Sequence, residues 1–116
     1  LEYLRIISFY PDIIQHVKTQ LPHIKADLLV QFQWKGNEWF PSRSLLEKGL
    51  HRINADGVGC ENKPEIVNQD FVDFYSRQGF RVGVWTVDST EQAEYYKNLG
   101  VTSITTNKPK LIRSIL

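Results

Sequence analysis

The sequence predicts an α/β protein built on a parallel sheet, and three observations support this fold class. The segment Arg81–Val87 has the pattern of a buried strand, and the capping pair Ser89 and Gln92 begins a helix directly after it. The segment Thr102–Thr106 repeats the plan as a strand that follows this helix. The apolar run Leu28–Val30 is typical of a strand buried on both faces. Consecutive strand–helix units of this kind indicate parallel strands.

Five strand–helix units are expected along the chain. The expected strands are Arg5–Phe9, Asp27–Phe32, Asp56–Cys60, Arg81–Val87 and Thr102–Thr106. The expected helices are Pro11–Leu21, Ser42–Arg52, Asn68–Gly79, Ser89–Gly100 and Pro109–Leu116. Prolines, N-cap residues and terminal glycines set these helix boundaries. The stretch Gln33–Pro41 is expected to be an irregular loop whose aromatic residues pack it against the protein, with a lid as the alternative.

Composition indicates one soluble globular domain over residues 1–116. Hydrophobic residues make up 41% of the chain and charged residues 23%. The net charge of +1 argues against a nucleic-acid partner, and no run of about 18 apolar residues predicts a membrane span. The single cysteine, Cys60, is expected to be a buried, unreactive residue, and one free thiol weakly favours the cytoplasm. Because the chain lacks methionine and starts almost directly in a strand, we expect a piece of a larger protein.

The units match the last five of an eight-unit β/α barrel better than an open nucleotide-binding sheet. Their lengths are regular, their strands contain glycine, and no G-x-G-x-x-G loop follows the first strand. A closed barrel needs about 250 residues, so this barrel is incomplete. In an incomplete barrel two strand edges and one face of the sheet would be exposed, which favours aggregation unless another segment covers them. The expected cover is a missing N-terminal half or a second copy of the chain.

Four segments resemble the C-terminal half of the glycerophosphodiester phosphodiesterases. They are Ile7–Asp12, Ala55–Val58, Val82–Asp88 and Gly100–Pro109, in the family's order and spacing. The family usually has Asn at the position of Asp88, and Asp commonly stands at the position of Asn107. The resemblance covers essentially the whole chain and implies a partial barrel of the phospholipase C-like phosphodiesterase fold.

The resemblance implies a role in lipid metabolism: hydrolysis of glycerophosphodiesters to an alcohol and glycerol 3-phosphate. The family uses two histidines and carboxylates that hold Mg²⁺ or Ca²⁺, and their motifs, which belong to the N-terminal half, do not occur here. His16, His23 and His51 have other neighbours. We therefore expect no catalytic residue and no bound metal in this chain, which alone would be inactive. The alternative is a non-catalytic half-barrel that serves binding or assembly, and a third reading is an unrelated flavodoxin-like domain.

The candidate substrate-binding residues are Trp85, Phe9, Ser8 and Lys63. The resemblance implies that Trp85, near a strand end, packs on the glycerol part of the substrate; ordinary core packing is the alternative. Phe9 and Ser8 lie at an equivalent strand end, with core or capping roles as their alternatives. Lys63 follows the third strand with Glu61 and Asn62, where it is suited to attract a phosphate unless it is simply solvated.

Two polar residues precede the last two helices. Asp88 and Asn107 are expected to cap them, because a side-chain oxygen in this position accepts hydrogen bonds from the first backbone N–H groups.

Overall fold

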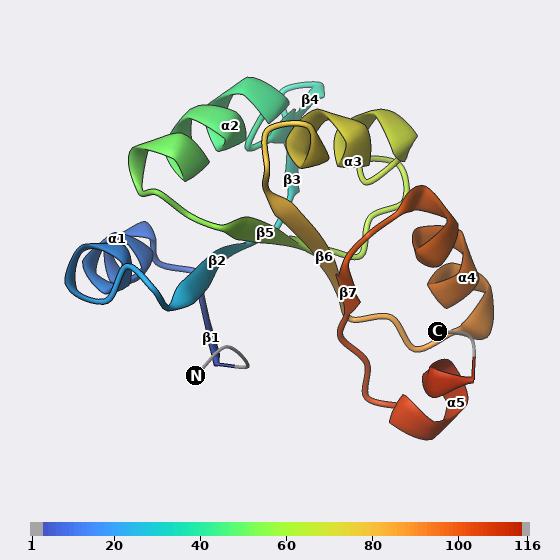
Figure 1. Cartoon of the computed structure of the whole chain (residues 1–116). Helices are drawn as coiled ribbons and strands as arrows, with labels where there is room; N and C mark the ends of the chain where they lie inside the picture. Colours follow the sequence, from blue (N-terminus) through green and yellow to red (C-terminus); the bar gives the residue numbers. More distant parts are fainter. Residues whose placement is uncertain (1–3, 115–116) are drawn as a thin grey trace.

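The computed structural model describes residues 4–114 as a curved sheet with helices along its outer side (Figure 1). The strands are β1 (Arg5–Ser8), β2 (Lys25–Val30), β3 (Gln33–Lys35), β4 (Glu38–Phe40), β5 (Gly57–Glu61), β6 (Arg81–Trp85) and β7 (Ser103–Ile104). The helices are α1 (Pro11–Gln20), α2 (Arg43–Arg52), α3 (Gln69–Ser76), α4 (Thr90–Leu99) and α5 (Pro109–Arg113). None of these helices has the length and apolar character that crossing a membrane requires.

Five strands form one parallel sheet in the order β1-β2-β5-β6-β7. The sheet curls like part of a barrel wall, and all five helices lie on its convex side (Figure 1). Each strand is joined to the next strand of the sheet through a helix, as parallel pairing requires. The predicted run of five β/α units in an incomplete barrel is therefore confirmed.

The hydrophobic core lies between the sheet and the helices. Apolar side chains from alternate positions of the central strands face the helices; they are Ala26, Leu28, Val30, Val58, Cys60, Val82 and Val84. Tyr75 and Tyr96 are fully buried, and their hydroxyl groups donate to Arg43 O at 2.9 Å and to Asn62 Oδ1 at 2.6 Å. Each phenol therefore gains apolar burial without leaving its polar end unsatisfied.

Cys60 lies in this core with no exposed surface. Burial raises the pKa of its thiol, because the thiolate would lose its hydration. The prediction of a buried cysteine is confirmed, and its protonated thiol behaves as a small apolar group.

On the concave face of the sheet, glycines take the place of larger residues on the central strands, at Gly57, Gly59 and Gly83. A Cβ atom at Gly57 would lie 2.7 Å from Arg81 O and from Asp27 Oδ1. Asp27 in turn accepts two hydrogen bonds from Arg5, from Nε at 2.6 Å and from Nη2 at 2.7 Å. The glycine therefore makes room for a bidentate ion pair at the amino-terminal end of the concave face.

The stretch that was expected to be an irregular loop is a β-hairpin. β3 and β4 pair antiparallel, and Trp34 lies opposite Trp39 with ring centroids 5.2 Å apart. Gly36 and Asn37 both have positive φ, 55° and 67°, as a two-residue turn of this hairpin type requires. The expectation is wrong because a turn-forming pair and a cross-strand aromatic pair outweigh the irregular composition. Trp39 packs against the core, whereas Trp34 is 58% exposed.

Several element ends also differ from the expected ones. The last strand is Ser103–Ile104 rather than Thr102–Thr106, and α3 ends at Ser76 instead of continuing to Gly79. Gly79 has φ +89° and lies in the turn that follows α3, so a positive-φ glycine does terminate this region. The end of the last expected helix, residues 115–116, lies outside the described residues.

Replacing Gly57 with alanine is expected to destabilise the fold by about 1–3 kcal/mol, because the new methyl group would overlap the Arg81 carbonyl oxygen. Gly49→Ala in α2 is the matched control, since its Cβ would meet nothing within 4 Å. The control should be neutral or stabilising by about 0.5–1 kcal/mol. Urea unfolding of both variants measures the difference, and equal free energies of unfolding would contradict the close approach at Gly57.

Candidate functional site

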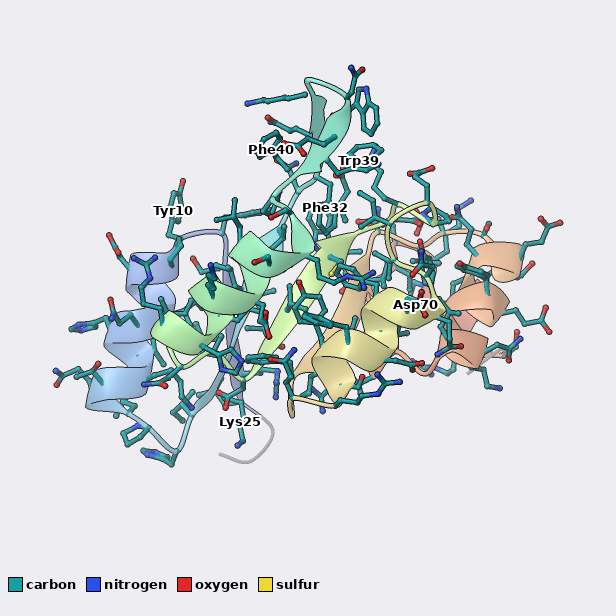
Figure 2. All side chains as sticks on the ribbon, turned by 90° about the horizontal axis from the view of Figure 1, so that it is seen from above. Tyr10, Lys25, Phe32, Trp39, Phe40 and Asp70 are labelled. Carbon is teal, nitrogen blue, oxygen red and sulfur yellow. The ribbon has the colours of Figure 1, made fainter. Side chains whose placement is uncertain are left out.

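The candidate site lies where the parallel strands end. In Figure 2, Lys25, which begins β2, lies at the opposite side of the molecule from Tyr10, which follows β1. Trp39 and Phe40 of the hairpin lie on the same side as Tyr10 (Figure 2). The hairpin therefore projects beyond the carboxyl-terminal edge of the sheet, the edge at which sites form in β/α barrels.

Trp85 and Phe9 meet on the concave side of this edge. Their rings contact edge to face, with centroids 5.7 Å apart and an interplanar angle of 87°. The Trp85 indole Nε1 donates to Gly59 O at 2.8 Å, which fixes the ring over the bare backbone of β5. Trp85 also lines a small hollow of about 50 Å³ with residues from the other four strands of the parallel sheet, among them Ile7, Leu29, Gly59 and Ser103, and with Thr105, which follows β7. The structure thus brings two of the four predicted site residues together.

The other two predicted residues have different surroundings. Ser8 alternates with Ile7, which lines the hollow, so its side chain points to the opposite face of β1. Ser8 Oγ accepts a hydrogen bond from Tyr10 N at 3.0 Å and so stabilises the turn into α1. Lys63 Nζ lies 5.8 Å from the ring centroid of Trp39, a cation–π contact with the hairpin. The structure does not bring Ser8 or Lys63 into the Phe9–Trp85 pair.

Asn62 is a residue of this edge that sequence reasoning did not select. Its backbone N donates to Trp85 O at 2.6 Å, and its side-chain Nδ2 donates to Thr86 O at 3.0 Å. Nδ2 also donates to Gln92 Oε1 at 2.9 Å, while Oδ1 accepts from the Tyr96 hydroxyl. Asn62 therefore holds the main chain on either side of the cis peptide bond between Trp85 and Thr86 and ties it to the core. Its proximity to Trp85 follows from the strand register, which the sequence pattern does not give.

Glu61 is the second residue that sequence reasoning did not select. It ends β5, lies opposite Trp85 in the strand register and is half-buried. Its Oε1 accepts a hydrogen bond from Phe32 N at 3.0 Å. The sequence feature that could have identified Glu61 is its spacing of two residues from Gly59, because residues at this spacing share one face of a strand and Gly59 lines the hollow.

Asp88 connects the last two loops of this edge rather than capping its own helix. Its Oδ1 accepts from Asn107 N and from Thr106 Oγ1, both at 2.8 Å. Ser89 is the N-cap of α4 and Lys108 the N-cap of α5, so the expected capping roles of Asp88 and Asn107 are wrong. The hydrogen bond from Asn107 and that from Thr106 lower the pKa of Asp88, because they stabilise the charged carboxylate.

The described residues do not provide a metal site. Within residues 4–114, no three His, Cys, Asp or Glu side chains are grouped so that they could hold an ion. A hard divalent cation needs several oxygen ligands in one place. Neither Glu61 nor Asp88 has a second carboxylate beside it in such a group, so these residues do not fit a resident metal on their own.

A larger cavity of about 240 Å³ lies below the hairpin, on the helix side of the sheet. Apolar side chains from β4, α2 and α3 and the segments beside them line most of it, including Phe32, Trp39, Leu46 and Phe71. Its polar rim contains Ser42 and Asn68, the N-cap residues of α2 and α3. Both side chains already accept hydrogen bonds from their own helices, at Leu45 N and Phe71 N. This cavity is separate from the Phe9–Trp85 pair.

Comparison with protein families gives one match that covers nearly the whole chain. The sequence model of the glycerophosphoryl diester phosphodiesterase family matches residues 2–111. A search of curated proteins found no match.

Solved structures of several phosphodiesterases share the fold. A glycerophosphodiester phosphodiesterase from Parabacteroides distasonis is 25% identical over 94% of this chain and 41% of its own, with a TM-score of 0.72. One from Thermotoga maritima is 13% identical over 97% and 47%, with a TM-score of 0.73. A phosphodiesterase from Oleispira antarctica, solved with the product sn-glycerol-3-phosphate, is 17% identical over 97% and 41%, with a TM-score of 0.76. The chain spans less than half the length of each of these proteins.

Asn62→Asp is expected to shift the Trp85 indole N–H resonance and to destabilise the chain by about 1–3 kcal/mol. The new carboxylate still accepts from Tyr96, and the Gln92 amide can rotate to donate to it. The Thr86 carbonyl cannot donate, so it faces a second acceptor. Asn54→Asp, an exposed change at the opposite ends of the strands, is the control. An unchanged indole resonance in a ¹⁵N-labelled Asn62→Asp chain would show that Asn62 does not position Trp85.

The contact between Asp88 and Asn107 is expected to persist to low pH. Because the pKa of Asp88 is lowered in the folded state, its charged carboxylate stabilises the fold fully above the ordinary carboxyl pKa of about 3.9. That stabilisation is lost as the pH falls through the lowered pKa. The amide resonance of Asn107, followed from pH 7 downwards, should titrate with a midpoint below about 3.9. The same titration should disappear in Asp88→Asn. A midpoint at or above the ordinary value would contradict the assignment.

Proposed function

Because the chain belongs to the glycerophosphoryl diester phosphodiesterase family, we propose that it forms the carboxyl-terminal part of a barrel that hydrolyses glycerophosphodiesters to an alcohol and glycerol 3-phosphate. The family match over residues 2–111 carries this proposal. The product complex of the Oleispira antarctica phosphodiesterase, which shares the fold, adds support for glycerol 3-phosphate as the ligand class.

In this proposal the chain supplies one wall of the substrate pocket. Trp85 and Phe9 form an apolar surface at the strand ends, and the carbon chain of glycerol packs against it. The hydrogen bond from Trp85 to Gly59 and the contacts of Asn62 hold that wall in one geometry. Lys63, at the same edge of the sheet, contributes positive charge toward an approaching phosphate, and Ser8 fixes the turn that presents Phe9.

The acid–base histidines and the ligands of the divalent cation, Mg²⁺ or Ca²⁺, come from outside this chain. This part of the proposal follows from the absence of a metal-ligand cluster within residues 4–114. Attack on a phosphodiester needs a positioned proton acceptor and donor, and no histidine lies beside the Phe9–Trp85 pair in the described residues. In this proposal the chain alone is inactive, and a preceding segment completes the barrel.

A second candidate function is a binding or assembly module without catalysis. The two outer strands, β1 and β7, each pair on one side only in the described structure, and exposed edges of this kind recruit other strands. In this alternative a second copy of the chain covers the open edges. Light scattering distinguishes the two, because a stable oligomer of the chain favours assembly and a monomer counts against it.

Hydrolysis of glycerophosphocholine with Mg²⁺ or Ca²⁺ tests the primary proposal. The chain extended at its amino terminus by the coding sequence that precedes Leu1 should release choline, and the chain by itself should not. A reading frame that begins at Leu1, or an extended protein without activity toward any glycerophosphodiester, would reject the proposal.

In the active extended protein, Trp85→Ala should lower kcat/KM by roughly tenfold to a hundredfold, or ~1.4–2.8 kcal/mol, through lost apolar contact with glycerol. Trp34→Ala is the matched control, because Trp34 is exposed on the hairpin and does not line the hollow beside Trp85. Equal effects of the two substitutions would contradict the assignment of Trp85 to the pocket wall.

A further inference from the structure

Glu61 stands at the rim of the concave face beside Trp85. Side chains alternate along β5, so Glu61 shares the face of Gly57 and Gly59. The parallel register places Glu61 opposite Trp85 on the neighbouring strand, and such strands lie about 4.8 Å apart. The Trp85 ring reaches back over Gly59. The carboxylate of Glu61 is therefore the next group along β5 beyond that ring, on the carboxyl-terminal side.

The Glu61 carboxylate is held in place without being neutralised. Phe32 N donates to Oε1, which uses one of the roughly four acceptor positions of a carboxylate. The salt bridges among residues 4–114 do not include Glu61. Lys63, two residues further on, directs its ammonium group to Trp39 instead. A half-buried, anchored carboxylate with free acceptor positions is suited to take charge-assisted hydrogen bonds from a ligand.

We propose that Glu61 accepts hydrogen bonds from the free hydroxyl groups of the substrate's glycerol moiety and thereby selects glycerophosphodiesters over diesters that lack those hydroxyls. This inference rests on the proposed function, to which it adds a specificity residue. A polyol presents C–H and O–H groups side by side. The Trp85 ring matches the C–H groups, and the Glu61 carboxylate beside it matches the O–H groups.

The discrimination follows from the cost of leaving the carboxylate unsatisfied. A site that hydrogen-bonds a substrate hydroxyl rejects the analogue without it, because the polar group of the site then loses both water and its partner. Oε1 is already oriented by Phe32 N, so little side-chain freedom is lost when the hydroxyl groups bind.

Binding of glycerol 3-phosphate and of propyl phosphate, which lacks both hydroxyls, tests the inference in the extended protein. Isothermal titration should show that glycerol 3-phosphate binds more tightly by about tenfold or more. Glu61→Gln keeps an acceptor for Phe32 N and removes the charge, so the preference should fall toward one while propyl phosphate binds unchanged. Glu65→Gln removes an exposed carboxylate of the same β5–α3 connection and should leave the preference intact.

Three binding results would overturn the inference, and one kinetic result would do so as well. The binding results are an undiminished preference in Glu61→Gln, equal weakening of both ligands, and binding of neither ligand by the unsubstituted protein. A rise in the Mg²⁺ concentration needed for turnover, with equal loss for glycerol and propyl diesters, would instead make Glu61 a cation ligand and would also overturn it. If the extended protein hydrolyses no diester but still prefers glycerol 3-phosphate, the proposed catalysis is rejected. The inference that Glu61 binds the glycerol hydroxyls is then retained.

Discussion

Close approach across the concave face of the sheet depends on the missing side chains of Gly57, Gly59 and Gly83. Each glycine lies where side chains of neighbouring strands cross: Asp27 and Arg81 meet at Gly57, Leu29 and Trp85 at Gly59, and Ser103 at Gly83. Glycines at such positions permit tight backbone approach and strong curvature. A Cβ atom at Gly59 would lie 2.7 Å from Leu29 Cδ2, and one at Gly57 would lie 2.7 Å from the Asp27 carboxylate that Arg5 holds.

The pocket wall is connected to the hydrophobic core through one chain of hydrogen bonds. Tyr96 is fully buried on α4, and its hydroxyl donates to Asn62, which in turn donates to the carbonyl of Thr86. The orientation of Trp85 is thus set partly by a residue whose ring is packed on the other face of the sheet. Such support from a rigid core is what a binding surface needs in order to hold its geometry when it is partly exposed.

Local sequence signals predicted most helices and strands, whereas contacts between distant segments determine the hairpin and the surroundings of the site residues. Ser42, Asn68 and Ser89 cap their helices as the pattern indicates, and the strand that begins at Arg81 forms as predicted but ends at Trp85 rather than Val87. The hairpin was missed because its Gly36-Asn37 turn lies between aromatic residues without clear alternation. Glu61 and Asn62 were missed because their importance comes from the strand paired with β5. The role of Asp88 was predicted wrongly because its hydrogen-bond partners lie in another loop. Register and tertiary contacts are not encoded in any short segment.

The ion pair of Arg5 and Asp27 has an electrostatic consequence for any anion that enters the concave face. Asp27 lines the same hollow as Trp85, and alone its carboxylate would repel a phosphate group. The bidentate contact places the positive charge of Arg5 directly against the Asp27 carboxylate and neutralises it. Both side chains are mostly buried, so solvent and salt screen the pair only weakly. The inner end of the hollow therefore presents a dipole instead of a net negative field. An anion that enters the hollow from the carboxyl-terminal edge of the sheet is therefore spared the repulsion of Asp27.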